Sequence, residues 1–589
     1  MDLKLWLMPA STVFGLVALN AIAGRLPIVS SALLAVAAGV LVPVFAFVIS
    51  LPPVHDRTVA FFHPFADGGG GGERVLWEAV RALQRSRPDL QVAIYCGWNE
   101  GEKKKKKKGK EKGGVEASSA SASPPFPPPT ESSLRAEARR RFGIQIRSPL
   151  MVVPIKYRER LLPERYRFAT ALRQALASIR LTAQALARLR PAAFVDTTGW
   201  AFGYPLARLA GCRVVAYVHY PTVSADMVRR VRAREAGFNN GGFARTALGA
   251  RLKAAYYGLL RHAYGHAGRC ASVVFANSTW TAARVRDAWW RQGGDDVRLL
   301  YPPADVAGLE AAAAKRREER GGAGAKAAPP LCVYVAQFRP EKGHETLLDA
   351  IVTLRAWAQQ REPRGGDEAS AGKGSTRSAP RPATELPFPP DLPVPFSPSR
   401  VLAARFAFVG GCRDAADAAR ADALEAEARA RGVPPSALAF ERDVPSDRLR
   451  ELLLDASVGL HAMRDEHFGI GVVEGCAAGA VPVAHDSGGP KEDIVVPAPD
   501  DWWASHLDGR DETDAQDDRD AADAPTGMLC SSPEEYARAL AIALSAPPAE
   551  LALLAANAQR RVRRFDASAF RAGFVQGVAA ALPPKPTTQ

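Results

Sequence analysis

The chain has 589 residues, enough for two or more domains, and 47% of them are hydrophobic, so a large core is available. Its seven cysteines are isolated and form no CxxC pair, which excludes a disulfide framework and a paired-cysteine metal site and favours a reducing compartment. The net charge is +15, but eight Lys and two Glu in residues 101–112 supply +6, which leaves 15 − 6 = +9 for the remainder. This remainder fits an anionic partner, phosphate or a membrane surface, and does not require nucleic acid.

The N-terminus predicts a membrane anchor. Residues 5–24 and 26–51 carry no charge, and Arg25 separates them. About 20 apolar residues span a bilayer, and the pair is too long for a signal peptide. We therefore expect an anchor over 1–54 with one or two spans. Basic residues such as Arg57 follow it, which favours a cytoplasmic main body.

Beyond the anchor, short apolar strands alternate with helices, a pattern typical of parallel sheets covered by helices. The first half contains helical patterns at 73–86 and 171–190, and its expected strands are 57–65, 90–98, 192–199, 212–220 and 271–279. These elements predict a Rossmann-like domain over 55–310.

A second strand set predicts a second Rossmann-like domain over 328–548, followed by a C-terminal helix and tail over 549–589. Its expected strands are 331–338, 405–411, 437–444, 456–463 and 480–487. Residues 311–330 have a linker composition. The expected fold is α/β, with two doubly wound domains facing a cleft, where ligands bind at the carboxyl ends of the strands.

Three insertions are expected to be disordered, because their compositions cannot form a packed core. They are Lys-rich and then Ser/Pro-rich 101–133, Pro-rich 361–400 and acidic 500–523.

A glycine run, HPFADGGGGGERVLWEAV over 63–80, lies between an expected strand and an expected helix. Gly70, Gly71 and Gly72 let a ligand approach the backbone closely, and a helix N-terminus favours anions. The alternative is a flexible linker. The run matches neither a Walker nor a GxGxxG pattern, so a nucleoside triphosphatase is not indicated.

Two further motifs follow strands. His219 in YVHYPTVSADM is expected at a carboxyl strand end facing the cleft, although a lone histidine is often structural. Arg339 and Lys342 in VAQFRPEKGHETLLDAI precede a helix that is expected to start at His344 or Glu345. Two cations there make a diphosphate clamp, and the alternative is a solvated basic turn.

The segment EHFGIGVVE holds two glutamates eight positions apart. An expected strand leads in, and a helix is expected to start at Gly469 and Gly471 and to run to about Ala478. Glu466 would then lie in the loop before this helix, and Glu474 inside it.

Together these motifs resemble family 4 of the retaining GT-B glycosyltransferases, through the E-x7-E pair, the R-P-E-K loop and the glycine loop. Longer matches, among them GFNNGGFAR, NSTWT and AHDSGGPKEDIVVP, resemble its GDP-mannose-dependent α-1,2-mannosyltransferase subfamily acting on dolichol-diphosphate oligosaccharide. The resemblance covers most of residues 55–500 outside the insertions.

The resemblance implies a retaining enzyme that adds the fourth and fifth mannoses of the N-glycan precursor on the cytosolic face of the endoplasmic reticulum membrane. It implies GDP-mannose and the dolichol-linked oligosaccharide as partners, with other mannosyltransferases of that pathway as further candidates and no nucleic acid. No cofactor is implied. No Asp-x-Asp pair ends a strand, so metal independence is expected.

The resemblance also implies residue roles. Arg339 and Lys342 match the positions that hold the donor diphosphate, Glu466 matches the glutamate facing the transferred sugar, and Glu474 matches the one binding the ribose. The remaining matches are backbone N–H donors at Gly469, Ile470 and Gly471, an active-site histidine at His219, and a phosphate or acceptor loop at Gly70, Gly71 and Gly72.

Residues 228–266 mix Arg and Lys with Tyr, Phe and Leu, which predicts an interfacial helix, the alternative being an ordinary basic surface helix. Other functions remain open: a soluble sucrose- or glycogen-type transferase, another lipid glycosyltransferase, or a membrane-tethered basic scaffold. The soluble type needs no apolar N-terminus, and the scaffold leaves the spaced motifs unexplained.

Overall fold

The computed structural model describes residues 39, 42–98, 128–166, 168–223, 229, 247–291, 297–320, 329–362, 388–389, 391–507 and 523–584. The predicted anchor up to residue 38 and residues 40–41 lie outside these ranges, as does most of each of the three predicted insertions. Residues 228 and 230–246 of the predicted interfacial segment lie outside them as well.

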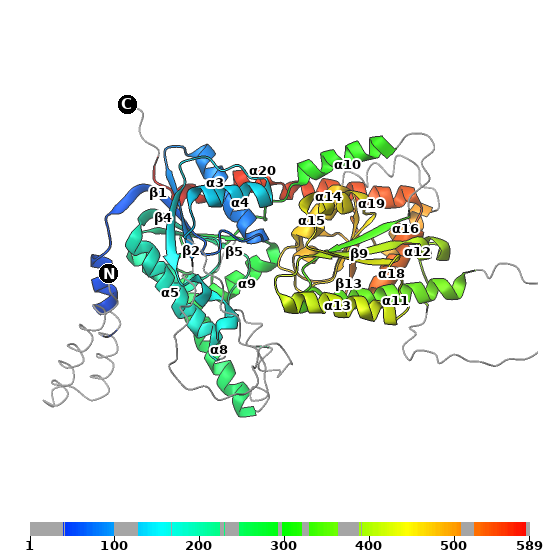
Figure 1. The fold of residues 1–589 in the computed structure, drawn as a ribbon, viewed down its shortest axis with the longest axis horizontal. Coiled ribbons are helices and arrows are strands. Elements are labelled where there is room, and N and C mark those ends of the chain that lie inside the picture. The colour runs from blue at the N-terminus through cyan, green and yellow to red at the C-terminus, as the bar shows by residue number, and fades with distance from the viewer. Residues whose placement is uncertain are drawn as a thin grey trace, which may run out of the picture. The chain divides into compact units, whose positions relative to one another are not determined.

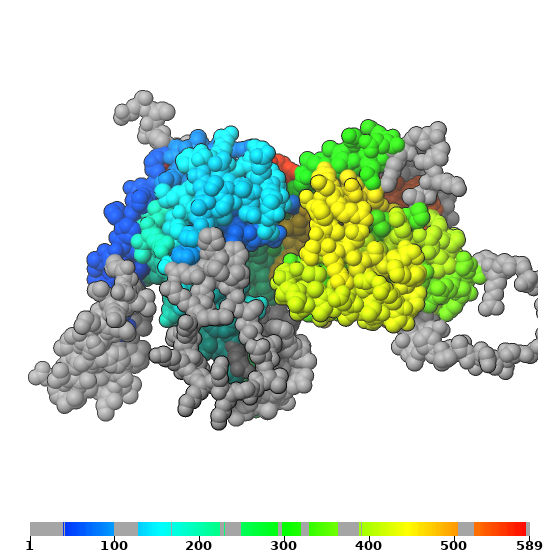
Figure 2. Space-filling view, viewed as in Figure 1, coloured from blue at the N-terminus to red at the C-terminus, as the bar shows by residue number. Residues whose placement is uncertain are grey.

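The chain divides into two compact units, each built on a parallel sheet (Figure 1). The first unit comprises residues 1–276, 282–298 and 571–589, and the second comprises 277–281 and 299–570. In the space-filling view the first unit is mainly blue to cyan-green, and the second green to orange (Figure 2). The prediction of two doubly wound α/β units is confirmed.

The first unit contains a seven-stranded parallel sheet in the order β3-β2-β1-β4-β5-β6-β7. Residues Val59 to Phe62 of β1 are all buried, as expected for a parallel strand covered on both faces. The strands are β1 Val54–Phe62, β2 Gln91–Trp98, β3 Met151–Lys156, β4 Arg190–Asp196, β5 Arg213–Val218, β6 Val273–Ala276 and β7 Arg298–Leu299. Strands β3 and β7 were not expected from the sequence.

The helices of the first unit pack through small and aliphatic side chains. In α5, Ala175, Ser178, Leu181 and Ala185 recur at helical spacing and are buried. The helices are α3 Gly71–Ser86, α4 Glu131–Phe142, α5 Thr170–Arg188, α6 Tyr204–Leu209 and α8 Ala247–Gly268, with α9 Thr279–Trp289 beginning in the second unit, and the short turns η2 Arg158–Leu161, η3 Pro163–Arg165 and η4 Ala201–Gly203.

The second unit contains a six-stranded parallel sheet in the order β10-β9-β8-β11-β12-β13, the same order of crossovers as in the first six strands of the first unit. The strands are β8 Leu331–Val335, β9 Arg405–Gly410, β10 Leu438–Arg442, β11 Val458–His461, β12 Val481–His485 and β13 Met528–Cys530. Strand β13 was not expected from the sequence.

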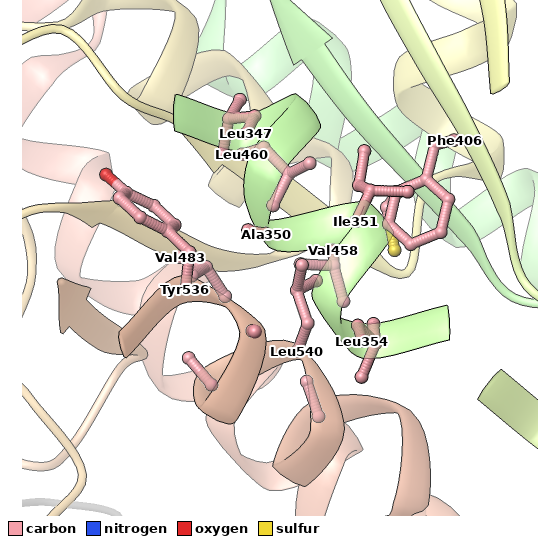
Figure 3. Close-up of a cluster of buried hydrophobic side chains, with 14 of the residues drawn as sticks. Leu347, Ala350, Ile351, Leu354, Phe406, Val458, Leu460, Val483, Tyr536 and Leu540 are labelled. Atoms are coloured by element: carbon pink, nitrogen blue, oxygen red, sulfur yellow. The ribbon is translucent and has the colours of Figure 1, made fainter. Parts of the chain in front are cut away.

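One face of this second sheet is covered by α11 and α18. Figure 3 shows Leu347, Ile351 and Leu354 of α11 with Tyr536 and Leu540 of α18, all belonging to one buried cluster with sheet residues. The helices and short turns of the unit are α10 Val306–Arg320, η7 Pro340–Lys342, α11 His344–Arg361, α12 Pro398–Ala403, α13 Ala415–Ala430, α14 Ser446–Asp455, α15 Ile470–Ala478, η8 Pro490–Ile494, α16 Asp500–Leu507, α18 Pro533–Ser545, α19 Pro548–Val562 and η9 Arg563–Phe565, and α20 Ala567–Val578 and η10 Ala579–Ala581 follow.

Several stretches that composition marks as linker or insertion are ordered at their edges. The start of the predicted linker 311–330 continues α10, and the start of the acidic stretch 500–523 is α16. Trp502 and Trp503 of α16 are buried in the core, at 8% and 1% exposure. These buried side chains order the segment despite its acidic composition, because each large apolar side chain that is buried stabilises the fold by about 1.5–3 kcal/mol. The prediction of disorder was wrong at these edges.

The observed unit boundaries differ from the expected ones. The first long segment ends at residue 298 instead of 310, and residues 571–589 belong to the first unit. Arg571 Nη1 lies 2.9 Å from Glu78 Oε2, and the Phe574 ring lies 6.3 Å from the Phe61 ring, so the returning chain packs on the first sheet. In the part of the chain that the structure describes, no single helix combines the length and hydropathy needed to cross a bilayer, and the helices Pro533–Ser545 and Pro548–Phe565, bent by 115°, meet that test only as a pair.

Candidate functional site

An ion pair at the strand ends of the second unit joins Lys342 and Glu466. Lys342 closes the short turn η7 after β8, and Gly343 then enters α11 with a φ of +68°, a conformation that favours glycine. The Lys342 ammonium Nζ lies 2.8 Å from Glu466 Oε2 and 3.0 Å from the sulfur of Met463. Tyr334 Oη donates to the Lys342 carbonyl, which fixes the turn against β8. The two residues stand 124 positions apart and form one ion pair.

Glu466 is an ionised carboxylate in this setting. Its Oε2 lies 3.4 Å from His461 Nε2, and its Oε1 accepts a bond of 3.2 Å from the His467 N–H. Burial by itself raises the pKa of Glu466, but the His461 hydrogen bond and the Lys342 charge outweigh burial and hold that pKa well below its usual range. Glu466 therefore carries no proton to donate at neutral pH.

The loop that presents Glu466 is held by the loop after β12. The Gly489 N–H donates to the Glu466 carbonyl at 2.8 Å, and the Asp465 N–H donates to Ser487 Oγ at 2.7 Å. Gly488 has a φ of +66°, and a methyl group added there would lie 2.2 Å from the Glu466 carbonyl oxygen. Only glycine fits at this close approach.

The helix after Glu466 begins where the sequence predicts. Gly469, with a φ of +104°, precedes α15, whose first residues are Ile470 and Gly471. A methyl group on Gly471 would lie 3.5 Å from the Val335 carbonyl at the end of β8, so this bare helix start adjoins the strand that leads to Lys342. The first backbone N–H groups of a helix lack intrahelical partners and favour anions. Glu474 lies half-buried in the second turn of α15, as expected.

Arg339 is placed differently from Lys342. It lies just before η7, and its Nη2 lies 2.6 Å from Glu341 Oε1. Its side chain is 35% exposed, against 21% for Lys342. The structure therefore joins Lys342 to Glu466 and pairs Arg339 with its own turn.

The predicted residues of the first unit lie together at the carboxyl end of its sheet. Gly70 precedes α3, and Gly71 and Gly72 begin it. A methyl group on Gly72 would lie 3.4 Å from His219 Nε2, and His219 follows β5 directly. The glycine loop and His219 thus meet in space, although 147 positions separate Gly72 from His219.

A polar chain supports that glycine loop. His63 lies 2.7 Å through Nδ1 from Thr197 Oγ1 and 3.4 Å through Nε2 from Glu73 Oε1. The Gly70 N–H donates to Glu73 Oε2 at 2.7 Å. Burial tends to raise the pKa of Glu73, but the bond and charge of His63 and the backbone N–H groups prevail and lower that pKa. Glu73 therefore remains a carboxylate within the loop.

The sequence reasoning missed the residues that orient these sites. His63 follows β1 as His219 follows β5, so the same strand-end rule indicates it. His461 ends β11, while Ser487 and Gly488 follow β12. In the described part of the chain, no group of three or more His, Cys, Asp and Glu side chains is arranged to hold a metal ion.

Two family models match parts of the chain. Residues 56–114 and 128–289 match the family described as ALG11 mannosyltransferase N-terminus, and residues 400–498 match glycosyl transferases group 1.

Curated proteins named GDP-Man:Man(3)GlcNAc(2)-PP-Dol alpha-1,2-mannosyltransferase are similar over most of the chain. The Mus musculus protein is 32% identical over 522 residues, covering 88% of this chain and 86% of its own. The Homo sapiens protein is 32% identical over 526 residues, with 89% and 87% covered. The Dictyostelium discoideum protein is 31% identical over 444 residues, with 75% and 73% covered.

Solved structures share the fold at low identity. The trehalose-phosphate synthase of Burkholderia vietnamiensis aligns over 89% of this chain and 100% of its own, with a TM-score of 0.52 and 12% identity. The enzyme of Burkholderia xenovorans aligns over 89% and 99%, with a TM-score of 0.52 and 13% identity. These likenesses concern the fold alone, and they confirm the predicted GT-B class.

Proposed function

Because the chain belongs to the ALG11 mannosyltransferase family, we propose that it transfers mannose from GDP-mannose to a dolichol-diphosphate-linked oligosaccharide through an α-1,2 linkage. The acceptor named for the curated relatives, Man(3)GlcNAc(2)-PP-Dol, carries three mannoses, so the first transfer adds the fourth, and we propose that a second transfer adds the fifth. The observation that carries this proposal is the Lys342–Glu466 pair beside the bare start of α15, at the carboxyl end of a parallel sheet.

The charge arrangement supports a role in holding the donor diphosphate. Sugar transfer breaks the bond between the sugar C1 and the diphosphate oxygen, and negative charge develops on the leaving GDP. Lys342 and the first N–H groups of α15 present preorganised positive charge, a term worth about 10²–10³ in rate for one donor group. Arg339 reaches the same phosphates when it leaves Glu341, which its 35% exposure permits.

Glu466 acts in this proposal as a fixed acceptor for the transferred mannose. Its carboxylate is already ionised by His461 and Lys342, so it accepts hydrogen bonds from sugar hydroxyls and stabilises positive charge developing at C1. The acceptor hydroxyl oxygen forms the new bond to C1 on the face that GDP leaves, and its proton passes to the leaving phosphate. The configuration is thereby retained without a protein nucleophile or a metal ion.

The remaining residues are proposed to bind the ribose of the donor and the acceptor. Glu474 binds the donor ribose, while Gly70, Gly71, Gly72 and His219 approach the donor phosphate or the acceptor. We place the reaction on the cytosolic face of the endoplasmic reticulum membrane. All seven cysteines are free, five of them buried, which suits a reducing compartment.

Product analysis tests this function. The full chain in detergent receives the Man(3)GlcNAc(2) dolichol-diphosphate acceptor with either GDP-mannose or UDP-glucose. With GDP-mannose we expect the acceptor to gain two mannoses, which an α-1,2-specific mannosidase removes. With UDP-glucose we expect the acceptor to gain no sugar. Glu466→Ala and Lys342→Ala are each expected to lower the transfer rate by about 10²-fold or more. Transfer to an earlier dolichol intermediate instead would favour another lipid mannosyltransferase.

A further inference from the structure

Helix α5 carries an apolar stripe on its exposed side, in addition to the apolar side chains that it buries. Leu172, Leu176 and Ile179 follow one another at helical spacing and are 40%, 48% and 36% exposed. The inward face already contributes Leu181 and Ala185 to the core. The exposed stripe is therefore not needed for packing, and a surface helix normally carries polar residues there.

Arginines flank this stripe. Arg173 and Arg180 lie on α5, Arg160 lies on the adjoining turn η2, and these three with Leu176 line a hollow of about 370 Å³. None of the three arginines forms an ion pair with a carboxylate within the described ranges. Their positive charge is thus available to an anion from outside. The arginine–leucine face is defined as Arg160, Leu172, Arg173, Leu176, Ile179 and Arg180.

This face is rigid rather than a loose loop. Gln174 Nε2 donates to the Leu161 carbonyl at 2.6 Å, which ties η2 to α5. Tyr166 Oη donates to the Arg160 carbonyl at 2.8 Å, and the Arg173 guanidinium lies 5.6 Å from the centre of the Tyr166 ring. These contacts hold the turn η2 and the Arg173 side chain in place before any partner binds.

The apolar N-terminal segment meets the same core. Residues 42–49 are helical, and Phe47 and Leu51 are buried in the cluster that also holds Leu161 and Ala177. Phe45 and Ile49 of the same short helix are 69% and 68% exposed. The uncharged sequence 26–51 therefore ends on the core layer that carries α5.

We propose that the arginine–leucine face docks on a bilayer, with the three arginines against anionic lipid headgroups and the three apolar side chains in the interface. Cations with interleaved apolar residues complement a negatively charged lipid surface, where each arginine contributes attraction and each apolar group leaves water. This surface adjoins the predicted interfacial segment 228–266, since the Leu172 N–H donates to Tyr256 Oη at 2.9 Å. The proposal rests on the proposed function only in that the acceptor is held in a membrane.

The test places a fluorophore on the face in the full chain. Cys270 and Cys412 are the two half-buried cysteines, so both become serine, and Ile179→Cys then carries the label. A matched control is Leu299→Cys, a leucine that is 44% exposed, lies outside the arginine–leucine face and ends β7 at the boundary between the two units. The chain is reconstituted in nanodiscs containing 30% phosphatidylserine, without sugar donor, and nitroxide groups on the lipid acyl chains serve as quenchers.

We expect strong quenching at residue 179 and little at residue 299. The double variant Arg173→Gln/Arg180→Gln should lower the ratio of quenched to unquenched label about fivefold for each arginine removed. In nanodiscs of neutral lipid, the two substitutions should leave this ratio unchanged. Adding inorganic phosphate to the nanodiscs should not release the label.

Equal quenching at residues 179 and 299, or an arginine effect that persists in neutral lipid, would overturn the proposal. Release of the label by phosphate would assign the hollow to a soluble anion. If the label in detergent became better protected from aqueous iodide as the protein concentration rose, the face would instead bind a second copy of the chain. Mannose transfer is measured separately. Quenching without transfer would reject the proposed function alone, whereas transfer without quenching would reject the docking face alone.

Discussion

The two sheets of the molecule share one order over their first six strands, but they use the carboxylate at or after their fourth strand differently. Asp196 ends β4, is 0% exposed, and accepts bonds from Thr198, Gly199 and Tyr204 of its own loop. Glu466 follows β11 and meets Lys342 from the turn after β8. The comparison teaches that loop donors make such a carboxylate structural, whereas a cation from the first strand–helix turn leaves it able to act on a ligand.

The two units also differ in their surfaces. Of the twelve large hydrophobic side chains that are exposed among the described residues, eleven belong to the first unit, and the twelfth, Leu299, ends β7 at the boundary between the two units. The second unit carries the Lys342–Glu466 pair beside a bare helix start, whereas the first unit carries an apolar surface flanked by arginines. Similar scaffolds have thus been adapted to different surroundings, which we propose to be a nucleotide sugar and a lipid surface.

Removing the cation beside Glu466 is expected to have the largest effect on activity. Lys342→Ala is expected to lower the transfer rate by about 10²–10³, because the leaving diphosphate loses a preorganised positive charge. The measurement is initial-rate transfer from GDP-mannose. Lys315→Ala is the control, since Lys315 is exposed and pairs only with Glu319 one helical turn away, at 3.9 Å. Equal rates in the two variants would contradict the role of Lys342.

Removing the structural carboxylate should act on stability. Asp196→Ala leaves the buried Tyr204 hydroxyl and two loop N–H groups without their acceptor, so we expect a loss of about 3 kcal/mol. The thermal midpoint of the first unit should fall by about 6–12 °C in scanning fluorimetry. Asp56→Ala, at an exposed position of the same unit, should leave the midpoint unchanged. A preserved midpoint with lost transfer would give Asp196 the same kind of role as Glu466.

Crowding the Glu466 loop should lower activity about 10²-fold, because small displacements of a reacting geometry have effects of that size. Gly488→Ala combines a φ of +66° with a methyl group 2.2 Å from the Glu466 carbonyl. Gly432→Ala is a matched control, since its φ is +80° and nothing lies within 4 Å of the added carbon. The control should lose only about 1–2 kcal/mol of stability and keep its transfer rate. If both variants lost activity equally, backbone strain alone would explain the effect.

The ionisation of Glu466 gives the smallest predicted effect. Its pKa is lowered in the folded chain, so its stabilising contribution is complete above the pKa of an unfolded glutamate, about 4.3, and declines as the pH falls further. The difference in thermal midpoint between the native chain and Glu466→Gln should stay constant from pH 8 to about 5 and shrink below about 4.3. A difference that declined already between pH 7 and 5 would mean a raised pKa and a protonated acid.

Much of the site follows from local sequence. Glycine permits conformations and approaches that other residues resist, so Gly469 correctly marked the start of α15, and Gly70 to Gly72 that of α3. The edges of the insertions were missed because Trp502 and Trp503 stand in acidic surroundings, and only a partner core shows what they bury. Strand β3 was missed because its polar flanks and Pro154 weaken the strand pattern.

The sequence by itself determined the class of fold, the glycine-marked helix starts and the residues placed after strand ends, because hydrophobic periodicity and glycine are local signals. Tertiary structure alone decided that Lys342 pairs with Glu466 while Arg339 pairs with Glu341, and that His63 and Glu73 support the glycine loop. It also decided that one face of α5 remains outside the core. These outcomes depend on how the folded backbone places the side chains. Lys342 and Glu466 are 124 positions apart and meet only in the folded chain, and a local pattern does not say which of Arg339 and Lys342 faces the glutamate.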